Sequence, residues 1–114
     1  MPKKDEGYLA KILIIDDDKE YCEVLENTLT IEGFRVDSVF NGEEALVRIS
    51  ERPYQLVVLD LTLPDISGMQ VLKRIKEMNA DIQVIIVSAV DTVGSAVESL
   101  KAGAFDFITK PIML

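Results

Sequence analysis

The sequence contains no histidine, no tryptophan and a single cysteine in its 114 residues. Without histidine, a Ser-His-Asp or Cys-His catalytic site cannot form within this chain, and zinc ligation of the usual His and Cys type is excluded too. Cys22 has no second cysteine to pair with, which excludes an internal disulfide and fits a reducing cytoplasm. We therefore expect a cytoplasmic protein whose metal, if it binds one, is a hard cation held by oxygen atoms.

Positive charge is also scarce. The chain has 12 Lys and Arg against 20 Asp and Glu, so its net charge is −8. Backbone recognition of a nucleic acid requires a basic surface, so we expect no direct nucleic-acid binding by this segment. No apolar run approaches the length of a membrane span, and the first 11 residues lack the apolar stretch of a signal peptide, so we expect no membrane partner. With 48% hydrophobic and 28% charged residues, the chain is typical of one compact domain.

Short apolar runs divide the sequence at regular intervals. Residues 12–15, 56–59 and 84–87 are continuously apolar rather than alternating, which is typical of parallel strands covered on both faces. Residues 34–39 are predicted to form a further, less buried strand, and residues 105–108 a fifth. Helical patterns separate these runs.

The helical patterns fill every gap between the predicted strands. Apolar residues recur at helical spacing in residues 19–32 and 68–78, and between Asn41, a natural N-cap, and Pro53. Asp91 is predicted to cap a fourth helix that runs to residue 102. Strict alternation of strands and helices predicts a doubly wound parallel α/β sheet with right-handed crossovers. Ligands of such sheets bind at the carboxyl ends of the strands.

Polar residues follow four of the predicted strands. Residues 16–18 are all aspartate, Asp60 follows the central apolar run, Ser88 follows the next, and Lys110 follows the last. Carboxylates about 5 Å apart repel by roughly 3 kcal/mol per pair at an effective dielectric constant of about 20. Mg²⁺ together with Lys110 would offset that repulsion, so the pattern predicts a site for a divalent cation and a phosphoryl group.

Asp60 is the best candidate for a nucleophile, since it is a single aspartate at the end of the central strand and a carboxylate can form an aspartyl-phosphate. Each residue has an ordinary alternative when taken alone. Asp60 and residues 16–18 could serve turns, Ser88 could bond the backbone at a strand end, and Lys110 could be an exposed lysine. Their joint placement at one edge of the sheet favours the functional interpretation.

Four segments together resemble the receiver domain of two-component response regulators. They are ILIIDDD at residues 12–18, VLDLTLPDISGM at 58–69, IVSA at 86–89 and GAFDFITKP at 103–111. The resemblance runs from about residue 10 to residue 113 and implies a flavodoxin-like sheet of order 2-1-3-4-5. Residues 1–9 would be an N-terminal lead and residues 10–114 a receiver domain truncated at its C-terminus. The family's fifth helix is then missing, and we expect apolar surface to be exposed beside the sheet.

The resemblance also implies a role for each acidic residue. Asp60 corresponds to the phosphorylated aspartate and also binds Mg²⁺. Asp17 corresponds to a direct Mg²⁺ ligand, Asp16 to one that acts partly through water, and Thr62 to the residue whose backbone carbonyl binds the metal. Lys110 corresponds to the lysine that pairs with the phosphoryl group.

Three further residues match the switch of the family. Ser88 corresponds to the hydroxyl that bonds the phosphoryl group, and Phe107 to the aromatic side chain that turns inward when Ser88 moves. The peptide bond before Pro111 is expected to be cis. Phosphorylation would thereby switch the face around residues 88–107.

The implied function is that of a phosphoprotein in two-component phosphorelay signal transduction. A sensor histidine kinase would donate the phosphoryl group, and the domain would slowly hydrolyse it without being a turnover enzyme. An effector domain beyond residue 114 and a homodimer are the other partners that the resemblance suggests. The alternative is a receiver-like interaction module that is not phosphorylated, against which the intact acids, Ser88 and Lys110 argue.

Two enzyme-like alternatives fit less well. A hydrolase of the haloacid-dehalogenase type needs a second acid two residues after the nucleophile, where this chain has Thr62. A Rossmann nucleotide-binding domain needs a glycine-rich turn after the first strand. Residues 16–18 stand there instead, and their charge would repel a pyrophosphate.

Overall fold

Strands and helices alternate along the whole of residues 7–111, the part of the chain that the computed structural model describes. The elements are β1 (Lys11–Ile15), α1 (Lys19–Ile31), β2 (Arg35–Val39), α2 (Gly42–Glu51), β3 (Leu56–Leu59), α3 (Gly68–Met78), β4 (Gln83–Ser88), α4 (Val93–Lys101) and β5 (Asp106–Thr109). The predicted order of elements is therefore confirmed.

All neighbouring strands pair in parallel, and the sheet order is β2-β1-β3-β4-β5. This is the flavodoxin-like order 2-1-3-4-5, so the predicted fold class is confirmed. The order reverses between β1 and β3, and Ile15 pairs with Leu59 at the carboxyl end of both strands. The residues that follow these two strands therefore leave the sheet side by side.

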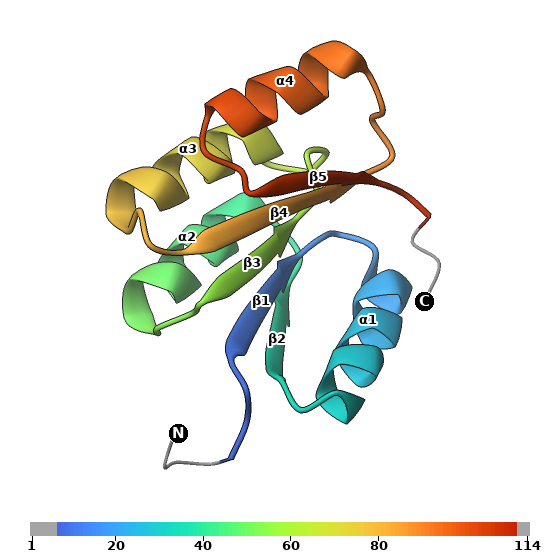
Figure 1. Ribbon diagram of the computed structural model, residues 1–114, viewed down its shortest axis with the longest axis vertical. Helices are drawn as coiled ribbons and strands as arrows, with labels where there is room; N and C mark the ends of the chain where they lie inside the picture. Colours follow the sequence, from blue (N-terminus) through green and yellow to red (C-terminus); the bar gives the residue numbers. More distant parts are fainter. Residues whose placement is uncertain (1–6, 112–114) are drawn as a thin grey trace.

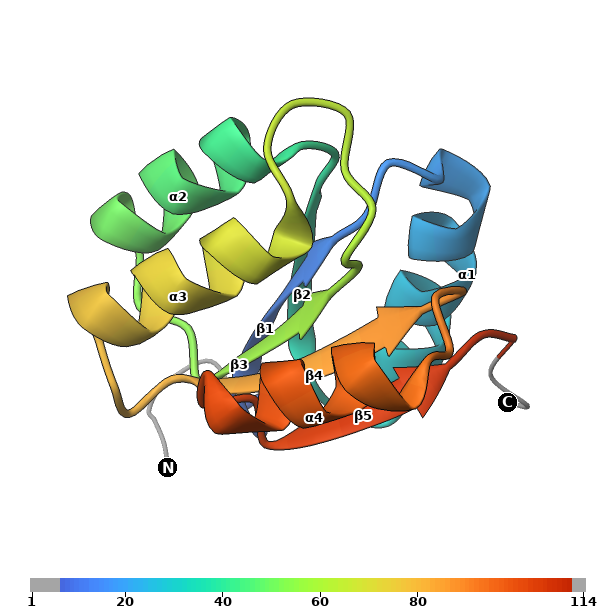
Figure 2. The same ribbon diagram turned by 90° about the horizontal axis from the view of Figure 1, so that it is seen from above.

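Helices cover both faces of the sheet. Figures 1 and 2 show α1 on one face and α2, α3 and α4 toward the other. The strand residues alternate accordingly: Leu13 and Ile15 belong to the core beneath α2 and α3, whereas Ile12 and Ile14 pack toward α1 with Cys22. Because β1, β3 and β4 are covered on both sides, their sequences are almost continuously apolar, unlike those of the edge strands β2 and β5.

The helix starts are set by side-chain caps. Asp18 accepts a hydrogen bond from the backbone of α1, Asn41 from that of α2, and Ser67 forms a reciprocal capping box with Gln70 at the start of α3. The predicted cap of the fourth helix is wrong by one residue. Thr92 rather than Asp91 caps α4, since the Ser95 N–H donates to its hydroxyl at 3.0 Å.

The last strand also begins one residue later than predicted, at Asp106. The Phe105 N–H still bonds the Val84 carbonyl at 2.7 Å, but its side chain is 68% exposed. Apolar side chains are exposed along α4 and β5, namely Val93, Val97, Leu100, Phe105 and Ile108. The expectation that the family's fifth helix is missing concerns positions beyond residue 111, which lie outside the described residues. No helix within residues 7–111 is long and apolar enough to cross a membrane.

Candidate functional site

Residues from four strand ends meet at the carboxyl edge of the sheet. Asp16 and Asp17 follow β1, Asp60 follows β3, Ser88 ends β4 and Lys110 follows β5. Asp16 is only 2% exposed, Asp60 is 7% exposed and Ser88 is fully buried, while Asp17 faces solvent. The structure thus brings together the acidic residues, the hydroxyl and the lysine that the sequence analysis singled out.

Lys110 joins the two buried carboxylates. Its Nζ lies 2.7 Å from Asp16 Oδ2 and 3.0 Å from Asp60 Oδ2, so one ammonium group donates to both acids. Burial by itself lowers the pKa of Lys110, but the hydrogen bonds to the two carboxylates outweigh it and raise that pKa well above its ordinary value. Lys110 therefore keeps its positive charge at neutral pH.

Burial also shifts the pKa of Asp16. Desolvation raises its pKa above the ordinary 3.8, and the hydrogen bonds from Lys110 and from the Asp18 N–H offset this only in part. Counted together, Asp16, Asp17, Asp60 and Lys110 carry three negative charges and one positive charge when ionised. The site therefore retains an excess of negative charge that a cation can neutralise.

The Asp60 carboxylate is held on both oxygens. Oδ1 accepts hydrogen bonds from the Ser88 hydroxyl at 2.9 Å and from the Thr62 N–H at 3.0 Å, and Oδ2 accepts from Lys110. The Ser88 hydroxyl in turn accepts from the Val90 N–H at 3.3 Å. Three donors from three different segments thus fix the orientation of one carboxylate. Such fixed donors beside a carboxylate are suited to stabilising the oxygens of a phosphoryl group bonded to it.

The acidic residues fit a divalent cation. Asp16, Asp17 and Asp60 each offer one carboxylate oxygen, and these oxygens lie within 4.8 Å of one another. Oxygens gathered this closely could hold a divalent cation, directly or through a bridging water. The donor set, all oxygen, suits a hard cation. A role for the Thr62 carbonyl stays a prediction.

The remaining predicted residues lie beside this cluster. The Lys110–Pro111 peptide bond is cis, as predicted. The Lys110 N–H bonds the Ser88 carbonyl at 2.9 Å, which continues the β4–β5 pairing up to the site. Phe107 is partly buried and packs against the core cluster beneath α2 and α3. Its role in a switch stays a prediction.

Sequence reasoning missed Tyr21 as part of the site. In the sequence it is simply one apolar position of an amphipathic helix, but the Lys110 Nζ lies 4.5 Å from the centre of its ring. Its hydroxyl is buried and has no hydrogen-bond partner among residues 7–111, and burial raises the pKa of Tyr21. The contact depends on how α1 crosses the sheet, and no sequence pattern encodes that crossing.

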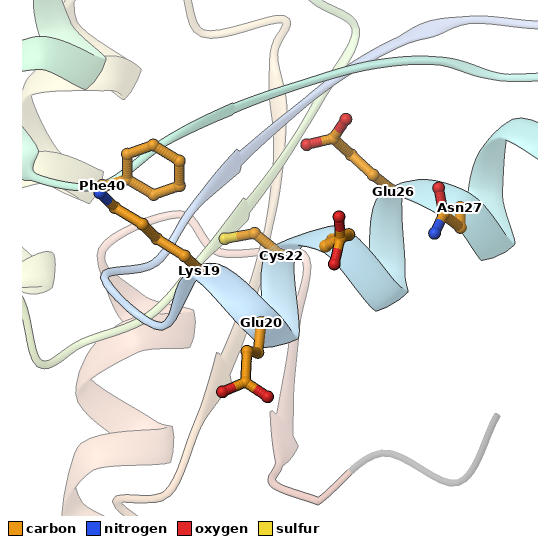
Figure 3. A pocket seen from close by; sticks show the side chains of 7 residues that line it. Lys19, Glu20, Cys22, Glu26, Asn27 and Phe40 are labelled. Atoms are coloured by element: carbon orange, nitrogen blue, oxygen red, sulfur yellow. The ribbon is translucent and has the colours of Figure 1, made fainter.

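A separate hollow of about 420 Å³ runs along α1 and is drawn in Figure 3. Its walls include Lys19, whose Nζ lies 5.0 Å from the Phe40 ring centre, and Cys22. None of the clustered acids, Ser88 or Lys110 lines it. Burial raises the pKa of Cys22 to about 11, so its thiol stays protonated and unreactive at neutral pH.

Comparison with known proteins gives consistent results. The family described as "Response regulator receiver domain" matches residues 12–114. The chain is 39% identical over 106 residues to the transcriptional regulatory protein ZraR of Klebsiella oxytoca, a match that covers 93% of this chain and 24% of that protein. The chain thus spans about a quarter of the length of this relative.

Two solved structures are similar throughout. The receiver domain of the Francisella response regulator 1452 has a TM-score of 0.86 and 33% identity, covering 92% of this chain and 87% of the other. A CheY-like receiver domain protein from Methanospirillum hungatei has a TM-score of 0.89 and 30% identity, covering 92% and 84%.

Proposed function

The chain belongs to the response regulator receiver domain family, and we propose that Asp60 is the residue that accepts the phosphoryl group in this two-component signalling domain. One observation carries the proposal: the Asp60 carboxylate is buried, yet Ser88, Thr62 and Lys110 each donate a hydrogen bond to it. A carboxylate held in this way is presented as a nucleophile in a fixed orientation.

Magnesium is the cation we propose for the acidic cluster. Asp16, Asp17 and Asp60 would hold it with their side chains and Thr62 with its backbone carbonyl. Bound there, Mg²⁺ would neutralise negative charge on the phosphoryl oxygens. A hard cation that keeps several waters and shares phosphate oxygens suits a cluster with one exposed acid, Asp17, on the solvent side.

The chain's own groups account for the transfer step. A carboxylate oxygen of Asp60 attacks phosphorus in line, the O–P bond forms as the P–N bond of a phosphohistidine breaks, and the imidazole leaves with the electron pair. Lys110 Nζ, now 3.0 Å from Asp60 Oδ2, lies where a transferred phosphoryl oxygen needs a positive partner. Ser88 Oγ, 2.9 Å from Asp60 Oδ1, supplies a hydroxyl donor.

The same contacts provide a switch. Phosphorylation of Asp60 replaces the acceptor of the Ser88 hydroxyl, and Ser88 follows the new phosphoryl oxygens. Because Ser88 ends β4 and pairs with Thr109 of β5, its movement is passed to the face around residues 88–107. Phe107 is the side chain we propose to turn further inward in response.

The partners follow from this role. We propose that a sensor histidine kinase is the phosphodonor, that the domain acts in the cytoplasm, and that an effector domain reads the switched face, with homodimerisation as one form of output. Hydrolysis of the phosphoryl group should be slow, since neither Thr62 nor Val90 offers an acid or amide to position a water molecule. Substituting Asn for Thr62 and Glu for Val90 should then shorten the lifetime of the phosphoryl group.

The test uses a small phosphodonor such as acetyl phosphate with Mg²⁺. Intact-mass spectrometry should detect one added phosphoryl group, and borohydride reduction followed by peptide mapping should place it at residue 60. Asp60→Asn should abolish the addition. No addition to the wild type, or a group mapped elsewhere, would instead support the receiver-like interaction module that is not phosphorylated.

A further inference from the structure

The N-terminus of α2 is capped from two directions. The Glu44 N–H donates to Asn41 Oδ1 at 2.8 Å, which is the local cap. The Gly42 and Glu43 N–H groups donate to the two carboxylate oxygens of Asp65, each at 2.8 Å. Asp65 lies more than 20 residues along the chain, in the loop that follows Asp60. A helix that already has its own cap thus binds a carboxylate from the loop of the functional site.

These bonds favour the ionised form of Asp65. Desolvation alone raises the pKa of a carboxyl group, but the backbone N–H donors outweigh it here and lower the pKa of Asp65 below 3.8. Asp65 is therefore charged at neutral pH and makes two charge-assisted hydrogen bonds at the positive end of the helix. The carboxylate stays bound although its side chain is exposed to solvent.

Ile66, the residue after Asp65, packs closely against Gly42 at the start of α2. A Cβ atom on Gly42 would lie 2.5 Å from Ile66 Cγ1, so only glycine permits this approach. At its base, the loop of residues 61–67 is closed by a hydrogen bond of 2.8 Å from the Gly68 N–H to the Leu61 carbonyl. The loop is thus fixed at its two ends and, through Asp65 and Ile66, against α2.

Thr62 lies near the start of this closed loop, next to the Leu61 carbonyl that closes it. Its N–H donates to Asp60 Oδ1 at 3.0 Å, and its carbonyl is the predicted metal ligand. A displacement of residues 61–67 would therefore move a donor to Asp60 and an oxygen offered to the cation together. Asp65 is the polar side chain that fixes the loop to α2.

We propose that Asp65 is a positioning residue for the metal and phosphoryl site: by binding the first N–H groups of α2 it holds residues 61–67 so that Thr62 stays against Asp60. The inference rests on the proposed function, since it concerns the same site. It assigns Asp65 no contact with the metal or with phosphate. Outer groups that orient ligands in this way typically contribute about 10-fold or more to metal affinity.

Mg²⁺ affinity measured by calorimetry tests the proposal. Asp65→Ala should weaken binding about 10-fold. Asp65→Asn removes the charge and keeps one carbonyl acceptor for the two N–H donors, so it should recover only part of the loss. Asn41→Ala is the matched control, because it removes a cap from the same helix without touching residues 61–67, and it should bind Mg²⁺ like the wild type. Circular dichroism should establish that all variants are folded at the temperature used.

A second measurement needs no metal. In ¹H–¹⁵N spectra recorded with EDTA, Asp65→Ala should shift the Thr62 amide, whereas Asn41→Ala should not. If Asp65→Ala binds Mg²⁺ as the wild type does, Asp65 only caps α2 and the proposal is wrong. If Asp65→Ala weakens Mg²⁺ binding but leaves the Thr62 amide where it is in the wild type, the effect is one of net charge, and the proposal is equally wrong. Either result leaves the proposed function standing, whereas absence of Mg²⁺ binding by the wild type would overturn both.

Discussion

Replacing Lys110 with methionine would remove the positive charge that two buried carboxylates share. The Lys110 side chain is 20% exposed, whereas those of Asp16 and Asp60 are 3% and 9% exposed. Methionine has nearly the same length and keeps the apolar contacts of the stem, so the change is mainly one of charge. Without metal, the variant is left with two carboxylates that neither solvent nor a cation compensates.

The expected loss of stability can be bounded from the geometry. At separations of 2.7 and 3.0 Å, the Coulomb attraction to Lys110 is about 6 kcal/mol per pair at an effective dielectric constant of about 20. Desolvation of the ammonium cancels much of this attraction. Removing one partner of a buried ion pair costs about 3–5 kcal/mol, and the partial exposure of Lys110 favours the lower end, about 3 kcal/mol.

Urea denaturation followed by circular dichroism at pH 7 measures this loss. In EDTA, about 3 kcal/mol corresponds to a midpoint lower by roughly 2 M urea if the slope is about 1.5 kcal/mol/M. Lys73→Met, on the exposed surface of α3, is the control and should change stability by less than about 0.5 kcal/mol.

Addition of Mg²⁺ should then narrow the gap between the variant and the wild type. The cation replaces the missing positive charge and no longer meets a competing ammonium, so the variant should bind it more tightly. Each 10-fold gain in affinity recovers about 1.4 kcal/mol at saturating metal. A variant as stable as the wild type in EDTA, or a gap that Mg²⁺ leaves unchanged, would refute the electrostatic reasoning.

Three further predictions concern packing and titration. Ser99→Ala should raise the free energy of unfolding by about 1 kcal/mol in urea melts, because the fully buried Ser99 hydroxyl has no hydrogen-bond partner within residues 7–111; a loss of stability would contradict this. Gly68→Ala should cost about 3 kcal/mol in urea melts, because its Cβ would clash with the Asp60 carbonyl oxygen and the Leu61 Cα. Gly94→Ala, whose Cβ would meet nothing within 4 Å, should instead gain about 0.5 kcal/mol, and equal effects of the two changes would be inconsistent with this geometry. Burial raises the pKa of Asp16 in the folded state above its ordinary value of 3.8, so ionisation of Asp16 opposes folding when no metal is bound. The free energy of unfolding of the wild type, relative to that of Asp16→Asn, should therefore fall as pH rises from 3.8 through the raised pKa. A rise across this range would count against the assignment.

The fold was predictable because its signals are local and redundant. Residues 12–15, 56–59 and 84–87 are apolar on both faces, so they could only be buried parallel strands, and the helices between them leave few possible topologies. The errors lie where one residue decides a boundary. Asp91 and Thr92 are both good caps, and which of them is used depends on the path of the chain after Ser88.

The candidate site was predictable as a set of residues but not as a network. Parallel strands bring Asp16, Asp60 and Lys110 to one edge, so their proximity follows from topology alone. Side-chain rotamers decide whether the Lys110 ammonium bridges the two carboxylates. The contact of Lys110 with Tyr21 depends on the angle at which α1 crosses the sheet. The bonds from Asp65 to α2 join residues more than 20 positions apart, and no local pattern encodes them.

The most direct test of the account is a ¹H–¹⁵N titration with beryllofluoride and Mg²⁺, comparing the wild type with Asp60→Asn. Beryllofluoride mimics a phosphoryl group on a carboxylate, so the wild type should show saturable shifts at residues 60–62 and along residues 88–110. Asp60→Asn should show none of them. An equal response in Asp60→Asn, or no response in the wild type, would contradict the claim that Asp60 accepts the phosphoryl group and drives the switch.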